Sequence, residues 1–531
     1  MLVLTWDMRS LEGHQQIYAY LTSTLAPARI SHFSLADGPG SRPDITSDGG
    51  IGAGFTFDMP ARRGRGYFIL LQDKDGSKTW KALSVFMTVD AIKGYEEIGA
   101  ELGTYEGHMR SWEDVHSERR ARIERDPYVI IMGAGQSGLM AAARFNQMSI
   151  SALVVEKKQR VGDQWRERYP TLSLHSIRNH HTMLYQQFPR NWPVFTPRDK
   201  MADWLEQYAV SQDLVVWTNS YVMPGAIYDP DRKRWTIVVC RNDMLVRLYP
   251  AHIVSAIGST GIPRTHHPPG RDIFLGKTMH SGHYPGGRHY AGMHAIVVGA
   301  CQSAADISQD LVANGAASVT MVQRSTTCVV SRNTGAEDFS MFWPDEESIE
   351  EHDFRFNAVP IGLKRIIAKA REPVSWDRDK ALYSKLKHSG LKLNMGSDGS
   401  GYMILAYERF GGYWFDVGLA DLIESGKVEV KHGVEIKEFT ETDVIFTDGS
   451  GLPADLVVFA TGWGDPREPL KEIFGSDVIN QTKKVWGLDS EGEITGCCRP
   501  TGHTALWYIA GDFSIARFYS KHLSSEKWGM L

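Results

Sequence analysis

Cysteine is scarce in this chain, and its few copies form no redox or metal motif. The 531 residues include five cysteines, and none are spaced as Cys-x-x-Cys, which disfavours a dithiol–disulfide reductase. Cys497 and Cys498 are adjacent, which is poor geometry for a redox pair. The histidine pairs have no cysteine partner at zinc-ligand spacing, so we expect no metal site.

Long apolar runs and a strong excess of one charge are also missing. No segment approaches the roughly 18–20 apolar residues that cross a bilayer, and the start lacks a secretory leader. The formal net charge is −5, so nothing favours nucleic acid as a partner. We therefore expect a soluble cytoplasmic protein of two or three domains, with neither a membrane nor a nucleic-acid partner.

Glycine, in contrast, is abundant, with 51 copies, and it marks two loops that each follow an apolar run. The first loop, Gly133-Ala134-Gly135-Gln136-Ser137-Gly138, follows an apolar run and opens a helix-like stretch. In a dinucleotide-binding turn, Gly133 would allow the tight bend, Gly135 would let the backbone approach a pyrophosphate, and Gly138 would let the helix pack on the strand. The first amides of the helix would attract the anion.

An acidic residue follows this loop at the spacing of a ribose-binding group. The apolar run 151–155 ends at Glu156, 18 residues after Gly138, against about 20 in dinucleotide sites. A carboxylate there accepts ribose hydroxyls and repels a 2′-phosphate, so the site suits FAD or NAD. A generic glycine turn is the alternative, but strand, loop, helix, strand and acid in this order favour the cofactor.

The second loop, Gly299-Ala300-Cys301-Gln302-Ser303-Ala304, is followed by an apolar run at 318–322 and then by Arg324. A guanidinium pairs bidentately with a 2′-phosphate, so this site suits NADPH. Cys301 replaces the middle glycine, and its Cβ is expected to crowd the pyrophosphate. A degenerate packing module is the alternative. Together the loops predict an α/β fold with two dinucleotide-binding Rossmann-type domains.

A third motif lies between the two loops. The segment 274–284 resembles the flavin-containing monooxygenase signature F-x-G-x-x-x-H-x-x-x-(Y/F), with Phe274, Gly276, His280 and Tyr284 at its fixed positions. In the related Baeyer–Villiger signature the last position is usually Trp, so Tyr284 favours the monooxygenase branch.

Further segments extend this resemblance over about residues 127–531. Gln164 and Trp165 lie in a stretch similar to the family's second flavin segment, and segments 256–263 and 455–463 resemble its two Ala-Thr-Gly strands and turns. Asp512 occupies the position of the acid that meets the ribityl chain. The resemblance is closest to soluble fungal and bacterial members and to the plant YUCCA enzymes.

The resemblance implies FAD in the first site and NADPH in the second. In the family, NADPH reduces FAD, oxygen adds to give a C4a-hydroperoxyflavin, and one oxygen atom passes to nitrogen or sulfur of a small molecule, here a specialised metabolite. Phe274, Gly276, His280 and Tyr284 would support the hinge between the domains. Baeyer–Villiger oxidation of a ketone, or a flavin-bearing scaffold or partner subunit, are the alternatives.

The first 105 residues predict a small α+β unit. A helix-like stretch runs from His14 to Leu25, and alternating runs at 66–72 and 79–86 flank an Asp75-Gly76 turn, which is typical of a hairpin. This unit resembles the cone-shaped SnoaL-like domain. A dimerisation or lid element, giving a possible homodimer, is favoured over a second active site.

The chain is thus expected to divide into five parts. A charged linker helix at 106–126 follows the first unit, and 127–290 forms the first part of the FAD-binding domain. Residues 291–452 form the NADPH-binding domain, and 453–531 complete the FAD-binding domain. Within the NADPH-binding domain, 336–413 is an insertion that would either line a substrate channel or pack as ordinary helices.

Overall fold

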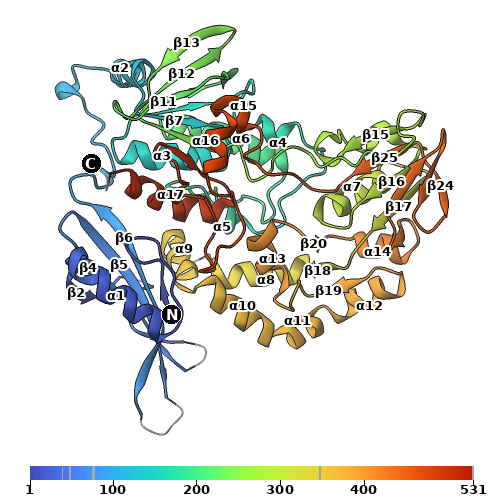
Figure 1. Ribbon diagram of the computed structural model, residues 1–531, viewed down its shortest axis with the longest axis horizontal. Helices are drawn as coiled ribbons and strands as arrows, with labels where there is room; N and C mark the ends of the chain where they lie inside the picture. Colours follow the sequence, from blue (N-terminus) through green and yellow to red (C-terminus); the bar gives the residue numbers. More distant parts are fainter. Residues whose placement is uncertain (39, 47–48, 74–77, 346–347, 529–531) are drawn as a thin grey trace.

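A parallel five-stranded sheet lies at the centre of the half that contains the first glycine loop, 133–138; we call it the flavin half after the cofactor expected there. A computed structural model describes residues 1–38, 40–46, 49–73, 78–345 and 348–528 (Figure 1). The strand order is β26-β14-β7-β8-β9, and every pairing is parallel. The strands are apolar runs because both faces are covered, as in other parallel sheets. Their bounds are β7 (Val129–Met132), β8 (Ala152–Val155), β9 (Val216–Trp217), β14 (His252–Ser255) and β26 (Leu506–Tyr508).

Helices cover this sheet, and a smaller antiparallel sheet extends it. Helix α3 packs against α17 and β8. The antiparallel sheet comprises β10 (Ser220–Val222), β11 (Ile227–Asp229), β12 (Arg234–Arg241) and β13 (Met244–Leu248). The helices of this half are α3 (Gln136–Gln147), α4 (Asp163–Arg166), α5 (Arg178–His181), α6 (Arg198–Ser211), α15 (Leu470–Phe474), α16 (Ser476–Gln481) and α17 (Phe513–Trp528).

A second parallel sheet has the order β15-β25-β16-β17-β21. Its elements are β15 (Lys277–His280), β16 (His294–Val298), β17 (Ser318–Gln323), β21 (Glu429–His432) and β25 (Leu456–Phe459), with helices α7 (Gln302–Ala313) and α14 (Leu419–Glu424) and the hairpin strands β22 (Ile436–Phe439), β23 (Asp443–Phe446) and β24 (Gly451–Pro453). The strands of this second sheet extend beyond the domain boundaries that the sequence predicted at residues 290 and 452. Both β15 and β25 pair within this second sheet, so it begins before residue 290 and regains a strand after residue 452.

The insertion is largely helical and returns to a short parallel sheet. Strand β18 (Thr327–Ser331) pairs with β19 (Leu393–Asn394) on one side and β20 (Tyr413–Asp416) on the other. The helices between are α8 (Arg332–Phe342), α9 (Ile349–Ala358), α10 (Ile361–Ala370), α11 (Glu372–Arg378), α12 (Lys380–His388) and α13 (Gly401–Arg409). Figure 1 shows these helices below the two parallel sheets.

The first unit is a mostly antiparallel sheet with one helix. The predicted hairpin is confirmed, because β5 pairs antiparallel with β6; its Asp75-Gly76 turn lies outside the described residues. The elements are β1 (Leu2–Val3), α1 (His14–Ala28), β2 (Ser31–Leu35), β3 (Asp44–Ile45), β4 (Ile51–Asp58), β5 (Arg62–Gln72) and β6 (Trp80–Ile92). A helix predicted at 106–126 is present as α2 (Trp112–Arg125), which the Ser111 hydroxyl caps by accepting from the Asp114 amide.

The sheet of this unit packs on the flavin half as well as on α1 (Figure 1). Phe86 of β6 is fully buried, and its ring lies 5.2 Å from Phe354 of α9 and 6.3 Å from Phe518 of α17. The Thr88 hydroxyl meets the Nε2 of His522 at 2.9 Å. The unit is therefore a layer of the molecule, held by side chains of α9 and α17.

We predict that acid weakens this interface through His522. Burial lowers the pKa of His522 to about 4 from 6.5. As the pH falls, His522 therefore binds a proton at a higher pH in the unfolded chain than in the folded chain. Stability is full above about pH 6.5 and falls as the pH drops towards 4, by about 2 kcal/mol at pH 5. Urea unfolding at about pH 7.5 and pH 5 should show this loss in the wild type, and His522→Gln should lack that part of it. An equal loss in both proteins would exclude His522 as the cause.

Candidate active site

The first glycine loop has the backbone geometry of a dinucleotide-binding turn. Gly133 has a φ of +106°, and a Cβ there would lie 2.7 Å from the Ala256 carbonyl oxygen. A Cβ on Gly138 would lie 2.0 Å from the Gly133 carbonyl oxygen, so α3 packs on the turn only because residue 138 has no side chain. Gly135 differs: a Cβ there would meet only Gln164 Nε2, at 3.7 Å. Gly135 thus faces open space at the start of α3.

Glu156 lies directly beside this turn. Its carboxylate is buried and accepts the Ala134 amide at 2.7 Å and the Lys158 amide at 2.8 Å. Each oxygen keeps a lone pair for a further donor. The side chain is therefore fixed by the backbone at the end of β8, in a position to accept hydroxyl groups.

Two side chains of α4 carry buried polar atoms that lack a partner among the described residues. These atoms are both amide atoms of Gln164 and the indole nitrogen of Trp165. Buried polar groups without a hydrogen bond are uncommon and costly in folded proteins. Gln164 Nε2 lies beside the open space at Gly135, so a polar ligand held between α3 and α4 would give these atoms partners. The residues present here fit FAD.

Asp512 follows β26 and completes the polar groups at this edge of the sheet. Its Oδ1 accepts the Ile515 amide and the Ser514 hydroxyl, both at 2.9 Å, and its Oδ2 lies 3.5 Å from His180 Nε2. Burial alone would raise the pKa of Asp512, but His180 and these two donors outweigh it and hold the pKa well below its usual value. The carboxylate is therefore ionised at neutral pH. Gln136, at the start of α3, donates to the carbonyl of Gly511 at 3.4 Å.

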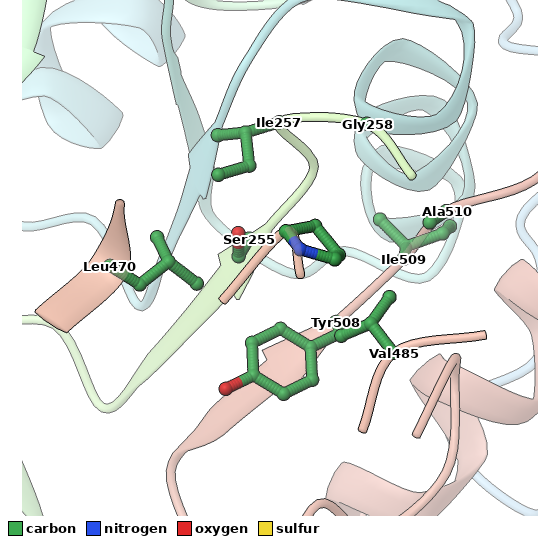
Figure 2. Close-up of a pocket in the computed structure, with 9 residues that line it drawn as sticks. Ser255, Ile257, Gly258, Leu470, Val485, Tyr508, Ile509 and Ala510 are labelled. Carbon is green, nitrogen blue, oxygen red and sulfur yellow. The ribbon is translucent and has the colours of Figure 1, made fainter. Parts of the chain in front are cut away.

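A small cavity lies at the ends of β14 and β26. It is lined by Ser255, Ile257 and Gly258 on one side and by Tyr508, Ile509 and Ala510 on the other (Figure 2). Its volume of about 10 Å³ is at the lower limit for one water molecule. It is therefore too small to be a substrate site.

The second loop has the same turn but a different environment. Gly299 has a φ of +127°, and a Cβ there would lie 2.5 Å from the Ala460 carbonyl oxygen. Ala304, in place of the third glycine, is fully buried against the turn, and Ser303 lies beside it in the first turn of α7. The Gln302 amide is engaged at both ends, since its Oε1 accepts the Phe415 amide at 2.9 Å and its Nε2 donates to Asp306 at 3.0 Å.

Cys301 precedes α7 with extended backbone, as Gly135 precedes α3. Burial raises the pKa of its thiol, while a hydrogen bond with the Gly412 backbone and the charge of Arg409 act against this. The thiol is therefore neutral, and it lies close to the turn that leads into β20.

Arg324 follows β17 directly, as Glu156 follows β8 in the first site. Its side chain is 70% exposed, and its Nη1 lies 3.1 Å from Glu435 Oε1. Any phosphate at this position would compete with the Glu435 carboxylate for the guanidinium.

The signature residues lie in and beside the second parallel sheet, and Phe274, His280 and Tyr284 are buried. Phe274 packs on Phe439 with ring centroids 5.0 Å apart, and a Cβ on Gly276 would lie 2.5 Å from the Phe274 ring. His280 bridges two turns, since its Nε2 lies 3.0 Å from the Gly462 carbonyl and its Nδ1 accepts the Gly282 amide at 3.1 Å. Burial lowers the pKa of His280, so the ring is neutral, with its proton on Nε2.

Two carboxylates on α7, which the sequence reasoning missed, connect the halves. Asp310 accepts the Tyr284 hydroxyl at 2.8 Å and the Thr171 hydroxyl at 2.7 Å. Asp306 accepts the Tyr169 hydroxyl at 2.6 Å. Their spacing of four residues, which places both on one helix face, was the available signal.

Aromatic side chains of the insertion link the two loops. Phe339 lies 4.8 Å from His180, which meets Asp512, and 6.3 Å from Phe415, whose amide is bound by Gln302. His175 stacks on Phe415 at 6.4 Å. Phe339 of the insertion therefore lies between a side chain that meets Asp512 and one that is bound to the second loop.

The fold and these two sites define a protein with two dinucleotide-binding domains. A match to the family described as "Flavin-binding monooxygenase-like" covers residues 127–473. The chain belongs to this family. The predictions of a flavin-dependent monooxygenase and of two Rossmann-type domains are thereby confirmed, and FAD and NADPH agree with the family and the fold.

Two plant proteins are among the curated relatives to which this chain is similar. The indole-3-pyruvate monooxygenase YUCCA1 of Oryza sativa subsp. japonica is 28% identical over 338 residues, 64% of this chain and 77% of the relative. The probable indole-3-pyruvate monooxygenase YUCCA1 of Arabidopsis thaliana is 26% identical over 338 residues, 63% of this chain and 75% of the relative.

Solved structures share the fold at lower identity. The flavin-containing monooxygenase from Stenotrophomonas maltophilia has a TM-score of 0.51 at 17% identity, covering 77% of this chain and all of that one. A cyclohexanone monooxygenase bound to epsilon-caprolactone has a TM-score of 0.55 at 15% identity, covering 76% and 86%. Within the described residues, no helix is long and apolar enough to cross a membrane.

We predict that Gly135→Ala abolishes FAD binding without unfolding the protein. The backbone at Gly135 suits any residue, and a methyl group there meets no protein atom closer than 3.7 Å. The same methyl group occupies the space where a pyrophosphate approaches. The variant should purify colourless with an unchanged circular dichroism spectrum.

Gly138→Ala is the matched control, because its methyl group meets the Gly133 carbonyl at 2.0 Å and should destabilise the fold itself. A yellow, fully loaded Gly135→Ala protein would contradict the placement of FAD at this loop.

Proposed function

We propose that this enzyme is an NADPH- and O2-dependent monooxygenase that oxygenates nitrogen or sulfur in a small specialised metabolite. The observation that carries the proposal is the set of unpartnered buried polar atoms on Gln164 and Trp165 of α4. Of these, Gln164 Nε2 faces the open start of α3, in a chain with a second dinucleotide loop. When bound, FAD would accept two electrons from NADPH and pass one oxygen atom of O2 to the substrate, the other leaving as water.

The residues around the flavin have separate tasks in this proposal. The amides of Gly135, Gln136, Ser137 and Gly138 receive the pyrophosphate of FAD. Glu156 accepts the ribose hydroxyls, Gln164 and Trp165 donate to the flavin side of the cofactor, and Asp512 accepts from the ribityl chain.

The second loop would receive NADPH in the same way. The start of α7, from Gly299 through Cys301, Gln302, Ser303 and Ala304, takes the pyrophosphate, and Arg324 takes the 2′-phosphate. Phe274, Gly276, His280 and Tyr284 hold the two halves in register and transfer no proton. This role is supported by the burial of Phe274, His280 and Tyr284 and by the neutral His280 ring, both nitrogens of which are hydrogen-bonded.

Baeyer–Villiger oxidation of a ketone is the second candidate. Tyr284 favours nitrogen or sulfur oxygenation, because the last position of the related Baeyer–Villiger signature is usually Trp.

The chemistry can be tested directly. We expect amines or sulfides, but not ketones, to accelerate NADPH oxidation by the flavin-loaded protein, with N-oxide or sulfoxide formed in step with NADPH consumed. Peroxide release without substrate serves as the uncoupling control. An ester or lactone from a ketone would establish the Baeyer–Villiger alternative, and the absence of substrate-coupled oxygen consumption would support a flavin-bearing scaffold.

Coenzyme choice gives a sharper test of the second site. A charge-assisted bond to phosphate contributes roughly 1.5–3 kcal/mol, so Arg324→Ala should raise the KM for NADPH about ten- to a hundredfold more than the KM for NADH. Glu435→Gln removes the competing carboxylate, and it should lower the KM for NADPH by about 1.5- to 5-fold. Equal effects of Arg324→Ala on both coenzymes would place the 2′-phosphate elsewhere.

The first unit supports further proposals. Its mixed sheet and its helix α1 are compatible with a SnoaL-like domain. We propose that the enzyme belongs to the soluble fungal and bacterial branch of the family and that it is cytoplasmic. We propose that the unit mediates a homodimer through β2, an edge strand with Phe33 and Leu35 each 57% exposed. Light scattering would measure the mass of one chain if this is wrong.

A further inference from the structure

An ion pair is buried between the insertion and the last helix. Arg517 of α17 donates from Nε and Nη2 to the two carboxylate oxygens of Asp353 in α9, at 2.7 and 2.8 Å. The Arg517 and Asp353 side chains are 2% and 3% exposed. Desolvation offsets much of the attraction in such a pair, so stability alone does not account for it.

The guanidinium also fixes the backbone of the His180–Thr182 turn. Its Nη1 donates to the His180 carbonyl at 2.8 Å and to the Thr182 carbonyl at 2.6 Å. Two carbonyls on either side of His181 are thereby held at fixed distances from Asp353.

A second path leads from Asp353 to the same histidine. The Trp343 indole donates to Asp353 Oδ1 at 2.8 Å, and the Trp343 ring meets the His180 ring edge-on at 4.8 Å. Asp353 thus determines both the backbone position of His180, through Arg517, and the position of its ring, through Trp343.

The ring of His180 has one nitrogen left for the cofactor site. Its Nδ1 contacts the Ser176 hydroxyl at 3.1 Å, and its Nε2 faces Asp512 at 3.5 Å. His180 is 4% exposed, so no bulk water replaces this contact. Ile515 and Ser514 hold Oδ1 of Asp512, and the position of its Oδ2 depends on where the insertion holds His180.

We propose that Asp353 is a positioning residue for the flavin, acting on Asp512 through Arg517, Trp343 and His180. The proposal rests on the assignment of Asp512 to FAD under the proposed function. In this proposal the insertion influences the affinity for FAD and the reduction potential of the bound flavin. Asp353 itself does not contact the cofactor.

The test compares two asparagine substitutions in the insertion. Asp353→Asn keeps an acceptor for Trp343 but removes the charge that pairs with Arg517. Asp398→Asn is the matched control, because Asp398 pairs with Arg365 and Lys369 within the same insertion and has no contact with His180. Each protein is stripped of flavin, its circular dichroism is recorded, and FAD is titrated by fluorescence quenching.

We expect Asp353→Asn to raise the Kd for FAD by about 2- to 30-fold and to shift the potential of the bound flavin, while Asp398→Asn leaves both close to the wild-type values. If Asp353→Asn does not fold, Trp343→Phe, which keeps an aromatic ring but removes the indole donor and part of the buried ring, should give a smaller change in the same direction. The positioning role would be overturned if Asp353→Asn kept the wild-type affinity and potential, or if Asp353→Asn and Asp398→Asn changed them equally. Where Asp353→Asn does not fold, wild-type values in Trp343→Phe would overturn it. A wild-type chain that binds no FAD would instead refute the proposed function.

Discussion

The cofactor edge of this protein depends on a backbone contact that leaves no room for a side chain. A Cβ on Gly138 would lie 2.0 Å from the Gly133 carbonyl oxygen, so α3 can begin directly at the end of β7 only with glycine at residue 138. This contact aims the first amides of α3 into the space beside Gly135, next to Glu156 and Gln164. The second loop repeats the turn at Gly299, with the methyl group of Ala304 accommodated in the place of the third glycine.

The two nucleotide-binding halves are joined by polar contacts as well as by apolar packing. Asp306 and Asp310 on α7 accept hydroxyls from Tyr169 and Thr171 of the first half, and Asp310 also accepts the Tyr284 hydroxyl. Such bonds are directional, so they add orientation to the apolar cluster that Tyr169 and Leu172 form with the second half. His280 performs a related task between two turns, which agrees with a supporting role for the signature.

Packing around the flavin half extends well beyond the two Rossmann-type domains. The first unit contacts α17 through Phe86, and the insertion contacts it through the Asp353–Arg517 pair. Because α17 begins at the residue after Asp512, both additions act on the helix that carries the proposed ribityl acid. A substitution far along the chain from the glycine loops can therefore reach the flavin site.

Local pattern was enough to predict the strand, turn and helix of both loops, because glycine geometry and apolar runs are properties of short segments. The sequence likewise determined the hairpin of the first unit and the family signature at 274–284. Tertiary structure decided which residues that are far apart in the chain come into contact. It places β15 and β25 in the second sheet, pairs Glu435 with Arg324, and bonds Gln302 to the backbone of Phe415. It also decided that Asp353, His180 and Arg517 meet beside Asp512. These contacts depend on how separate elements pack, and no spacing within a single segment encodes that.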